Sequence, residues 1–159
     1  MSTHTISLQP IVINAPAETV WQVLTDLERY PEWNPFTVRA ESTLEIGSGV
    51  DLYIPRGEKM MKQSFVLEIL DPPKEIAWRL PKMLHKSVFN AYRTQKVVPV
   101  DAERCTYQTS DTFDGWIAGK LYRSQSGWVL KNFNKLADAL KERSEAQYAE
   151  EQRPLRSPH

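Results

Sequence analysis

The segment Trp116–Tyr148 decides the fold, and it reads WIAGKLYRSQSGWVLKNFNKLADALKERSEAQY. It contains no proline, and its apolar residues recur at the spacing of an α-helix. A helix of this length measures roughly 48 Å, which is long enough to lie across a whole β-sheet. The elements that precede it are therefore expected to pack against one long helix.

The region before this helix has the pattern of consecutive β-strands separated by short turns. Strands are expected at residues 37–46, 50–54, 62–70, 75–80, 88–98 and 104–113. Gly47-Ser48-Gly49 is typical of a hairpin turn, and Asp71-Pro72-Pro73-Lys74 of another. Because parallel strands would need long crossover connections, turns this short predict an antiparallel meander.

The N-terminal region supplies one more strand and a short helix. Apolar residues predict a strand over residues 5–13, with Pro10 near an edge or a bulge. Asn14 is expected to cap the following helix, with Pro16 near its first turn. The prolines of Tyr30–Pro35 end that helix, because each disfavours helical geometry in the residue before it. The whole order predicts an α+β domain with a cleft between the sheet and the long helix.

The composition favours one globular domain. Of 159 residues, 41% are hydrophobic and 25% are charged, which is ordinary for a folded domain and too apolar for a disordered chain. The domain is expected to span residues 1–150, followed by a polar tail at 151–159. Five tryptophans in so small a domain suggest a pocket, because large rings cannot all fill a small core.

The charge balance and the rare residues exclude several classes of function. The 20 basic and 20 acidic residues give a net charge of zero, so no nucleic-acid partner is expected. We expect no membrane span and no secretory signal, because neither apolar pattern occurs. Cys105 is the single cysteine, which excludes an internal disulfide and fits a reducing cytoplasm. His4, His85 and His159 lack metal-ligand spacing, so neither a metal nor a cofactor is expected.

Several short motifs follow one another along the chain. They are Ala15–Trp21, Leu27–Phe36, Asp71-Pro72-Pro73, Ile76–Arg79 and Thr112–Gly115. Together they resemble the START-like helix-grip superfamily (the SRPBCC group), which includes polyketide cyclase/dehydrase-like and lipid-transport proteins. The resemblance implies a curved antiparallel sheet of about seven strands wrapped around a long C-terminal helix, with one or two short helices after the first strand. It does not select one activity, because that superfamily hosts many functions on one cavity.

Strand alternation predicts which side chains face the long helix. The predicted inward residues are Val50, Leu52, Ile54, Phe65, Leu67, Ile69, Ile76, Trp78, Leu80, Phe89, Ala91, Arg93, Gln95, Val97, Cys105, Tyr107, Thr109, Asp111 and Phe113. Arg93 and Asp111 thus fall on the concave side of neighbouring strands. On the long helix, Gln125 and Asn132 lie near the centre of the apolar stripe, where an amide without a partner costs about 1–3 kcal/mol.

These residues have two interpretations, a satisfied core network or a lined ligand pocket. The candidate ligand-binding residues are Arg93, Asp111, Gln125, Asn132, Tyr107, Trp78, Phe65 and Trp128. In a pocket, the polar members would orient one end of a ligand, and the aromatic members would form its walls. Acid–base chemistry at Asp111 is a further possibility. Pairing with Arg93 would, however, lower the pKa of Asp111 and make it a weak base.

Three functions follow from these observations. The leading hypothesis is binding of a hydrophobic or amphipathic small molecule, such as a lipid or a polyketide, between the sheet and the helix. The second is a polyketide cyclase/dehydratase-like enzyme acting in the same cavity. The third is a cochaperone-like interaction module that uses the tail and the charged run Lys141-Glu142-Arg143. A homodimer is compatible with all three.

Overall fold

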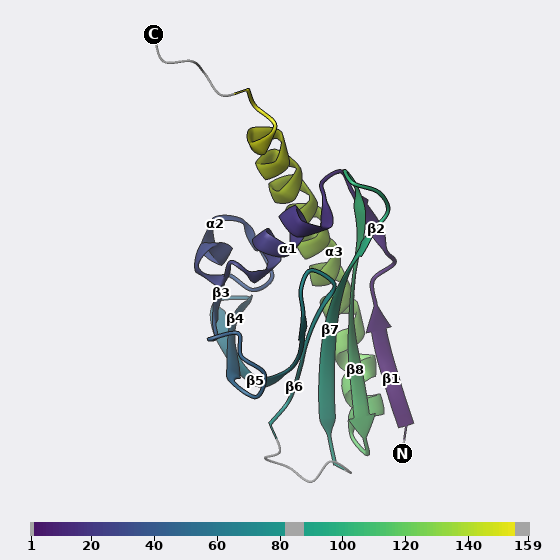
Figure 1. The fold of residues 1–159 in the computed structure, drawn as a ribbon. Helices are drawn as coiled ribbons and strands as arrows, with labels where there is room; N and C mark the ends of the chain where they lie inside the picture. Colours follow the sequence, from purple (N-terminus) through teal and green to yellow (C-terminus); the bar gives the residue numbers. More distant parts are fainter. Residues whose placement is uncertain (1, 82–87, 155–159) are drawn as a thin grey trace.

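The computed structural model describes residues 2–81 and 88–154 (Figure 1). The elements are β1 (Ser2–Ser7), β2 (Ile11–Ile13), α1 (Ala17–Thr25), the short 3-10 helix η1 (Leu27–Arg29), α2 (Tyr30–Trp33), β3 (Arg39–Glu41), β4 (Gly49–Arg56), β5 (Lys59–Asp71), β6 (Glu75–Arg79), β7 (Asn90–Pro99), β8 (Cys105–Gly115) and α3 (Ala118–Glu151). His85, which lacked metal-ligand spacing in the sequence, lies outside the described residues.

The strands form one antiparallel sheet of eight strands in the order β1-β8-β7-β6-β5-β4-β3, with β2 also paired to β8. The sheet curves, and the long helix α3 runs along it (Figure 1). Helix α3 contacts β1, β2 and β8, and α1 packs against α3. This arrangement confirms the predicted α+β helix-grip fold. None of the described helices is long and apolar enough to cross a membrane.

Several element boundaries differ from the sequence predictions. The strand expected at 5–13 is two strands, β1 and β2, separated by residues 8–10, where Pro10 cannot donate to a ladder. Of the strand expected at 37–46, only Arg39–Glu41 forms. Leu44 has a φ of 55°, a left-handed conformation that a strand does not accommodate. Helix α1 begins after Pro16 and has no side-chain cap, so the prediction of Asn14 as its cap was wrong.

The strands have the predicted inward faces, except beyond one irregularity in β5. The pairing of β5 with β6 shifts between Leu67 and Ile69, and such a bulge reverses which side chains face inward. Leu70 therefore packs against the core, opposite Ile76. Ile69, which strict alternation placed inside, points to the other face.

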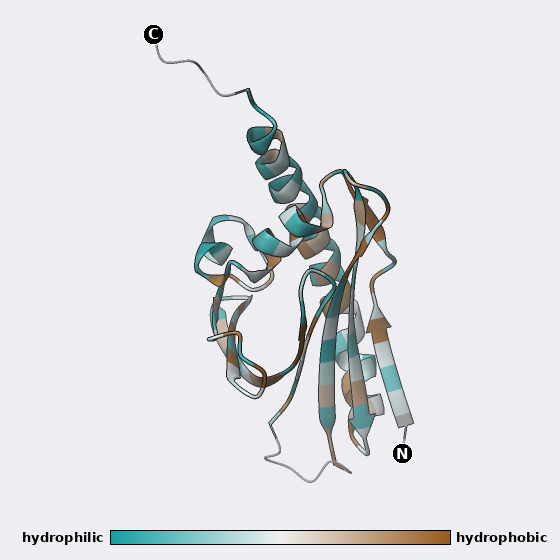
Figure 2. Ribbon diagram, viewed as in Figure 1, coloured by the Kyte–Doolittle hydropathy of each residue, from teal (hydrophilic) through white to brown (hydrophobic). Residues whose placement is uncertain are grey.

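The two halves of α3 have different surroundings. Its C-terminal turns extend past the sheet (Figure 1) and are mostly hydrophilic (Figure 2). Phe133, Leu136 and Leu140 are buried against the sheet and α1, and they anchor the middle of the helix. Toward the N-terminus of α3, the helix and strands β4 and β5 lie on opposite sides of a cavity. The curvature of the sheet thus leaves space beside a helix that is otherwise firmly packed.

Gly115 ends β8, where the sheet joins α3. Its φ is +110°, and a Cβ there would lie 2.5 Å from the Val88 carbonyl oxygen. We expect Gly115→Ala to lower the free energy of unfolding by more than about 1 kcal/mol, because both the backbone and the contact are strained. Gly49→Ala, whose Cβ would meet nothing within 4 Å, is the control. Equal urea midpoints for the two variants would contradict the prediction.

Candidate functional site

A large cavity of about 410 Å³ lies between the curved sheet and α3. Small-molecule sites commonly measure about 300–1,000 Å³ and have mostly apolar walls with a few polar groups. The lining residues are Phe36, Ile54, Arg56, Met61, Gln63, Ser64, Phe65, Leu80, Phe89, Ala91, Asp111, Phe113, Leu121, Gln125, Trp128 and Val129. Aromatic and aliphatic side chains predominate, so the cavity has the size and the composition of a ligand site.

Four of the eight candidate residues from the sequence line this large cavity. They are Phe65, Asp111, Gln125 and Trp128. Phe65 and Asp111 come from opposite regions of the sheet, and the other two come from α3. The alternation of the strands and the period of α3 therefore identify side chains that meet at one cavity, although β5, β8 and α3 are separate segments of the sequence.

Two other candidates, Tyr107 and Asn132, line neither the large cavity nor its smaller neighbour described below. The Tyr107 hydroxyl is fully buried and donates to Gln95 Oε1 at 2.5 Å. Burial raises the pKa of Tyr107 to about 12, so this hydroxyl stays protonated. Asn132 Nδ2 donates to the Trp128 carbonyl one turn earlier in α3, at 2.8 Å. Both polar groups thus satisfy bonds within the protein.

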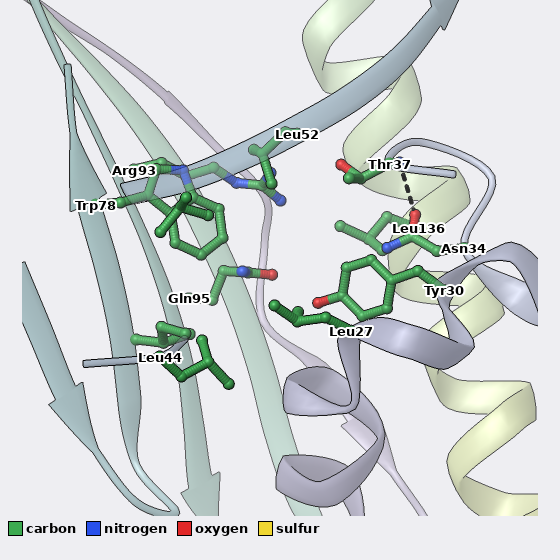
Figure 3. Close-up of a pocket in the computed structure, with 12 residues that line it drawn as sticks. Leu27, Tyr30, Asn34, Thr37, Leu44, Leu52, Trp78, Arg93, Gln95 and Leu136 are labelled. Atoms are coloured by element: carbon green, nitrogen blue, oxygen red, sulfur yellow. Dashed lines mark hydrogen bonds between the residues drawn. The ribbon is translucent and has the colours of Figure 1, made fainter. Parts of the chain in front are cut away.

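The remaining two candidates, Trp78 and Arg93, line a second, small cavity of about 10 Å³. This volume holds about one water-sized group. In Figure 3 the Arg93 and Gln95 side chains extend from β7 toward Tyr30 and Thr37 on the opposite wall. The structure therefore places six of the candidates at two neighbouring spaces, where the sequence predicts one pocket.

Arg93 is held in the core by rings and one hydroxyl. Its guanidinium carbon lies 5.3 Å from the ring centroid of Phe36, 5.5 Å from that of Trp78 and 4.9 Å from that of Phe133. Its Nε donates to Thr109 Oγ1 at 3.3 Å. Cation–π contacts of this kind contribute up to about 2 kcal/mol when the cation is desolvated. They offset part of the cost of burying a guanidinium that makes no ion pair among the described residues.

Asp111 pairs with Arg93 in the register of β7 and β8, but its carboxyl faces the large cavity. Within the part of the chain that the structure describes, this carboxyl has no hydrogen-bond or ion-pair partner. Burial raises its pKa from 3.8 to about 6, and the positive charge of Arg93 only partly opposes that effect. The prediction of a lowered pKa was wrong, because desolvation outweighs an attraction that involves no direct contact.

The sequence patterns do not single out Arg56 as a site residue. Arg56 ends β4, and its guanidinium carbon lies 4.5 Å from the ring centroid of Trp128 on α3. It thereby borders the large cavity from the tip of the β4–β5 hairpin. Phe36 was also missed, because it follows α2 in an irregular segment without periodicity. Its position is fixed by Asn34, whose Oδ1 accepts bonds from the backbone amides of Phe36 and Thr37.

The polar groups that line the large cavity are one carboxyl, two amides, one hydroxyl and one guanidinium. No group of three or more potential metal ligands occurs within residues 2–81 and 88–154. Cys105 is buried in β8, and burial raises the pKa of its thiol to about 11, which makes it a poor nucleophile. Asp111 supplies the carboxyl among the residues that line the large cavity, and burial raises its pKa to about 6.

The raised pKa of Asp111 predicts a dependence of stability on pH. Because the native state binds this proton more tightly than the unfolded state, stability is lost as the pH rises from about 4 to about 6. Asp111→Asn removes that loss. We expect the variant to gain on the order of 2 kcal/mol over the native protein between pH 4 and pH 7, measured by urea unfolding. Asp138→Asn, on the exposed face of α3, controls for removal of a carboxylate, and an identical gain in both variants would refute the assignment.

Proteins of similar structure are known. They include an aromatase/cyclase from a Streptomyces species (20% identity, TM-score 0.71, 92% of this chain and 96% of that one). Norcoclaurine synthase from Thalictrum flavum, in complex with dopamine and hydroxybenzaldehyde, has 14% identity and a TM-score of 0.66 over 96% and 90% of the two chains. A START superfamily protein from Mycobacterium smegmatis has 19% identity and a TM-score of 0.68 over 91% and 99%. At these identities the likeness concerns the fold.

Sequence comparison adds a relative and a family. The Oxopyrrolidines biosynthesis cluster protein O from Penicillium oxalicum is 32% identical over an alignment that covers 46% of this chain and 48% of that protein. The match thus spans about half the length of the relative. Residues 4–145 match the family described as polyketide cyclase / dehydrase and lipid transport, and the chain belongs to that family.

Proposed function

We propose that this protein binds a hydrophobic or amphipathic small molecule in the large cavity. The observation that carries the proposal is an apolar space of about 410 Å³ in which a few polar groups converge. Membership of a family described by cyclisation, dehydration and lipid transport supports it. Burial of the ligand's apolar surface would supply most of the affinity, at about 25 cal/mol per Å².

The polar groups of the cavity define how such a ligand would lie. Asp111 and Gln125 come from β8 and α3, on two walls of the cavity. Gln125 makes one long bond within the protein, from its Nε2 to Ser124 Oγ at 3.4 Å. Both side chains therefore retain hydrogen-bonding capacity for a hydroxyl or a carbonyl of the ligand. Phe65 and Trp128 would contact its apolar body.

Filling the cavity from α3 tests the binding site. We expect Gln125→Trp to weaken binding of the uncharged fluorescent probe N-phenyl-naphthylamine by about tenfold or more, because an indole would occupy space that the probe needs. The matched control is Ser124→Trp, which introduces the same side chain at the neighbouring, exposed position. Fluorescence titration measures both affinities. If the two variants bind as tightly as the native protein, the probe binds elsewhere and the site is wrong.

A second candidate function, acid–base catalysis in the same cavity, is favoured by Asp111. A carboxyl with a pKa of about 6 is ionised at neutral pH and still basic enough to remove a proton efficiently. Its lack of a partner among the described residues leaves its oxygens open to a bound molecule. Cyclisation and dehydration both require such a proton transfer, so the second function uses the site of the first.

A carbon-acid reporter distinguishes catalysis from binding alone. We expect the native protein to accelerate ring opening of nitrobenzisoxazole, with a rate that rises with pH through about 6, because only the ionised carboxylate accepts the proton. Asp111→Asn should lower that rate by about tenfold or more, with Asp138→Asn unchanged. Equal rates in the native protein and Asp111→Asn would leave binding as the function that the site supports.

A further inference from the structure

Two side chains that line the small cavity carry buried donors without partners among the described residues. Arg93 Nη2 and Trp78 Nε1 make no hydrogen bond within residues 2–81 and 88–154. The two side chains are only 6% and 5% exposed, and both line the small cavity. Unpartnered buried donors are rare, because each has lost its hydrogen bonds with water, and the loss is greater for a charged donor. The pair therefore marks a place where an acceptor oxygen is missing from the protein itself.

The protein supplies no negative charge to this cavity. Its other polar lining residues are neutral, namely Tyr30, Asn34, Thr37 and Gln95. Asp111, which pairs with Arg93 in the strand register, makes no ion pair with it among the described residues and faces the large cavity instead. The guanidinium consequently retains an unmet preference for an anion, since a buried charge is costly unless it is paired.

Two phenylalanines that line the large cavity contact the side chains that carry these donors. Phe36 lines the large cavity, and its ring lies 5.3 Å from the Arg93 guanidinium carbon. Phe65 lines the same cavity, and its ring centroid lies 6.4 Å from that of Trp78. Each unpartnered donor thus belongs to a side chain that contacts the wall of the large cavity. A ligand bound there would be one aromatic ring away from both donors.

We infer that the small cavity is a subsite for an oxygen of a ligand carboxylate, held by Arg93 and Trp78 when the Phe36 ring turns aside. This inference rests on the proposed binding function and narrows the ligand class to amphipathic acids. The apolar body of the acid lies in the large cavity, and its charged end supplies the acceptor that the protein lacks. A volume of about 10 Å³ accepts one such oxygen and no larger group.

A pair of probes that differ only at the polar end tests the subsite. Dodecanoate and dodecanol have the same number of carbon atoms and differ at the terminal carbon, and calorimetric titration measures the affinity of each. We expect Arg93→Met to weaken dodecanoate binding by about tenfold or more and to change dodecanol binding by less than about twofold, because a charged hydrogen bond is lost while the apolar wall is kept. Trp78→Phe, which removes a single N–H, should weaken dodecanoate alone by about threefold.

Trp116→Phe is the matched control, since this indole is 78% exposed and lines neither cavity. If Arg93→Met does not fold, the effect of Trp78→Phe on dodecanoate binding tests the subsite. Equal effects of the variants on both probes, or no effect on either, would overturn the subsite and leave the donors to an internal water. Failure of the native protein to bind either dodecanoate or dodecanol would overturn the proposed function, and the subsite with it.

Discussion

The burial of the Arg93 guanidinium depends on several parts of this structure being in place together. Arg93 projects from β7 into a space bounded by Phe36 after α2, Trp78 on β6 and Phe133 on α3. A charge in the interior costs several kcal/mol unless it is compensated. The contacts with these rings and with Thr109 are available only when the sheet, the segment after α2 and the long helix are all in place. Arg93 therefore couples the position of α3 to that of Phe36.

The Arg93 guanidinium also bears on the large cavity, through Asp111 on the neighbouring strand. Asp111 lies across from Arg93 in the strand register, yet the two side chains face different cavities. Direct pairing would have neutralised both and fixed Asp111 as an ordinary carboxylate. Separation leaves a carboxyl whose pKa is raised to about 6 and a guanidinium whose Nη2 lacks a partner among the described residues. Each side chain retains a hydrogen-bonding capacity that a satisfied core pair would have lost.

The fold could be predicted from the sequence further than the site could. A proline-free stretch and short turns suffice for a long helix on an antiparallel sheet, and period alone placed Phe65, Asp111, Gln125 and Trp128 at the large cavity. Alternation failed at the bulge after Leu67, because a shift in register leaves no local mark in the side chains. The direction of the Asp111 pKa shift depends on how close Arg93 comes, a distance that the sequence does not contain.

Arg56, one of the missed residues, lies on the wall of the large cavity that faces α3. Helix α3 contacts β1, β2 and β8, so that side of the cavity is constrained by the core. The β4–β5 hairpin supplies much of the opposite wall, including Arg56, whose contact with Trp128 bridges the hairpin to α3. Loops and hairpin tips tolerate change far better than packed strands do. Substitution in the hairpin can therefore alter which molecule is held while the Arg93 core stays intact, which is how one fold can host many functions.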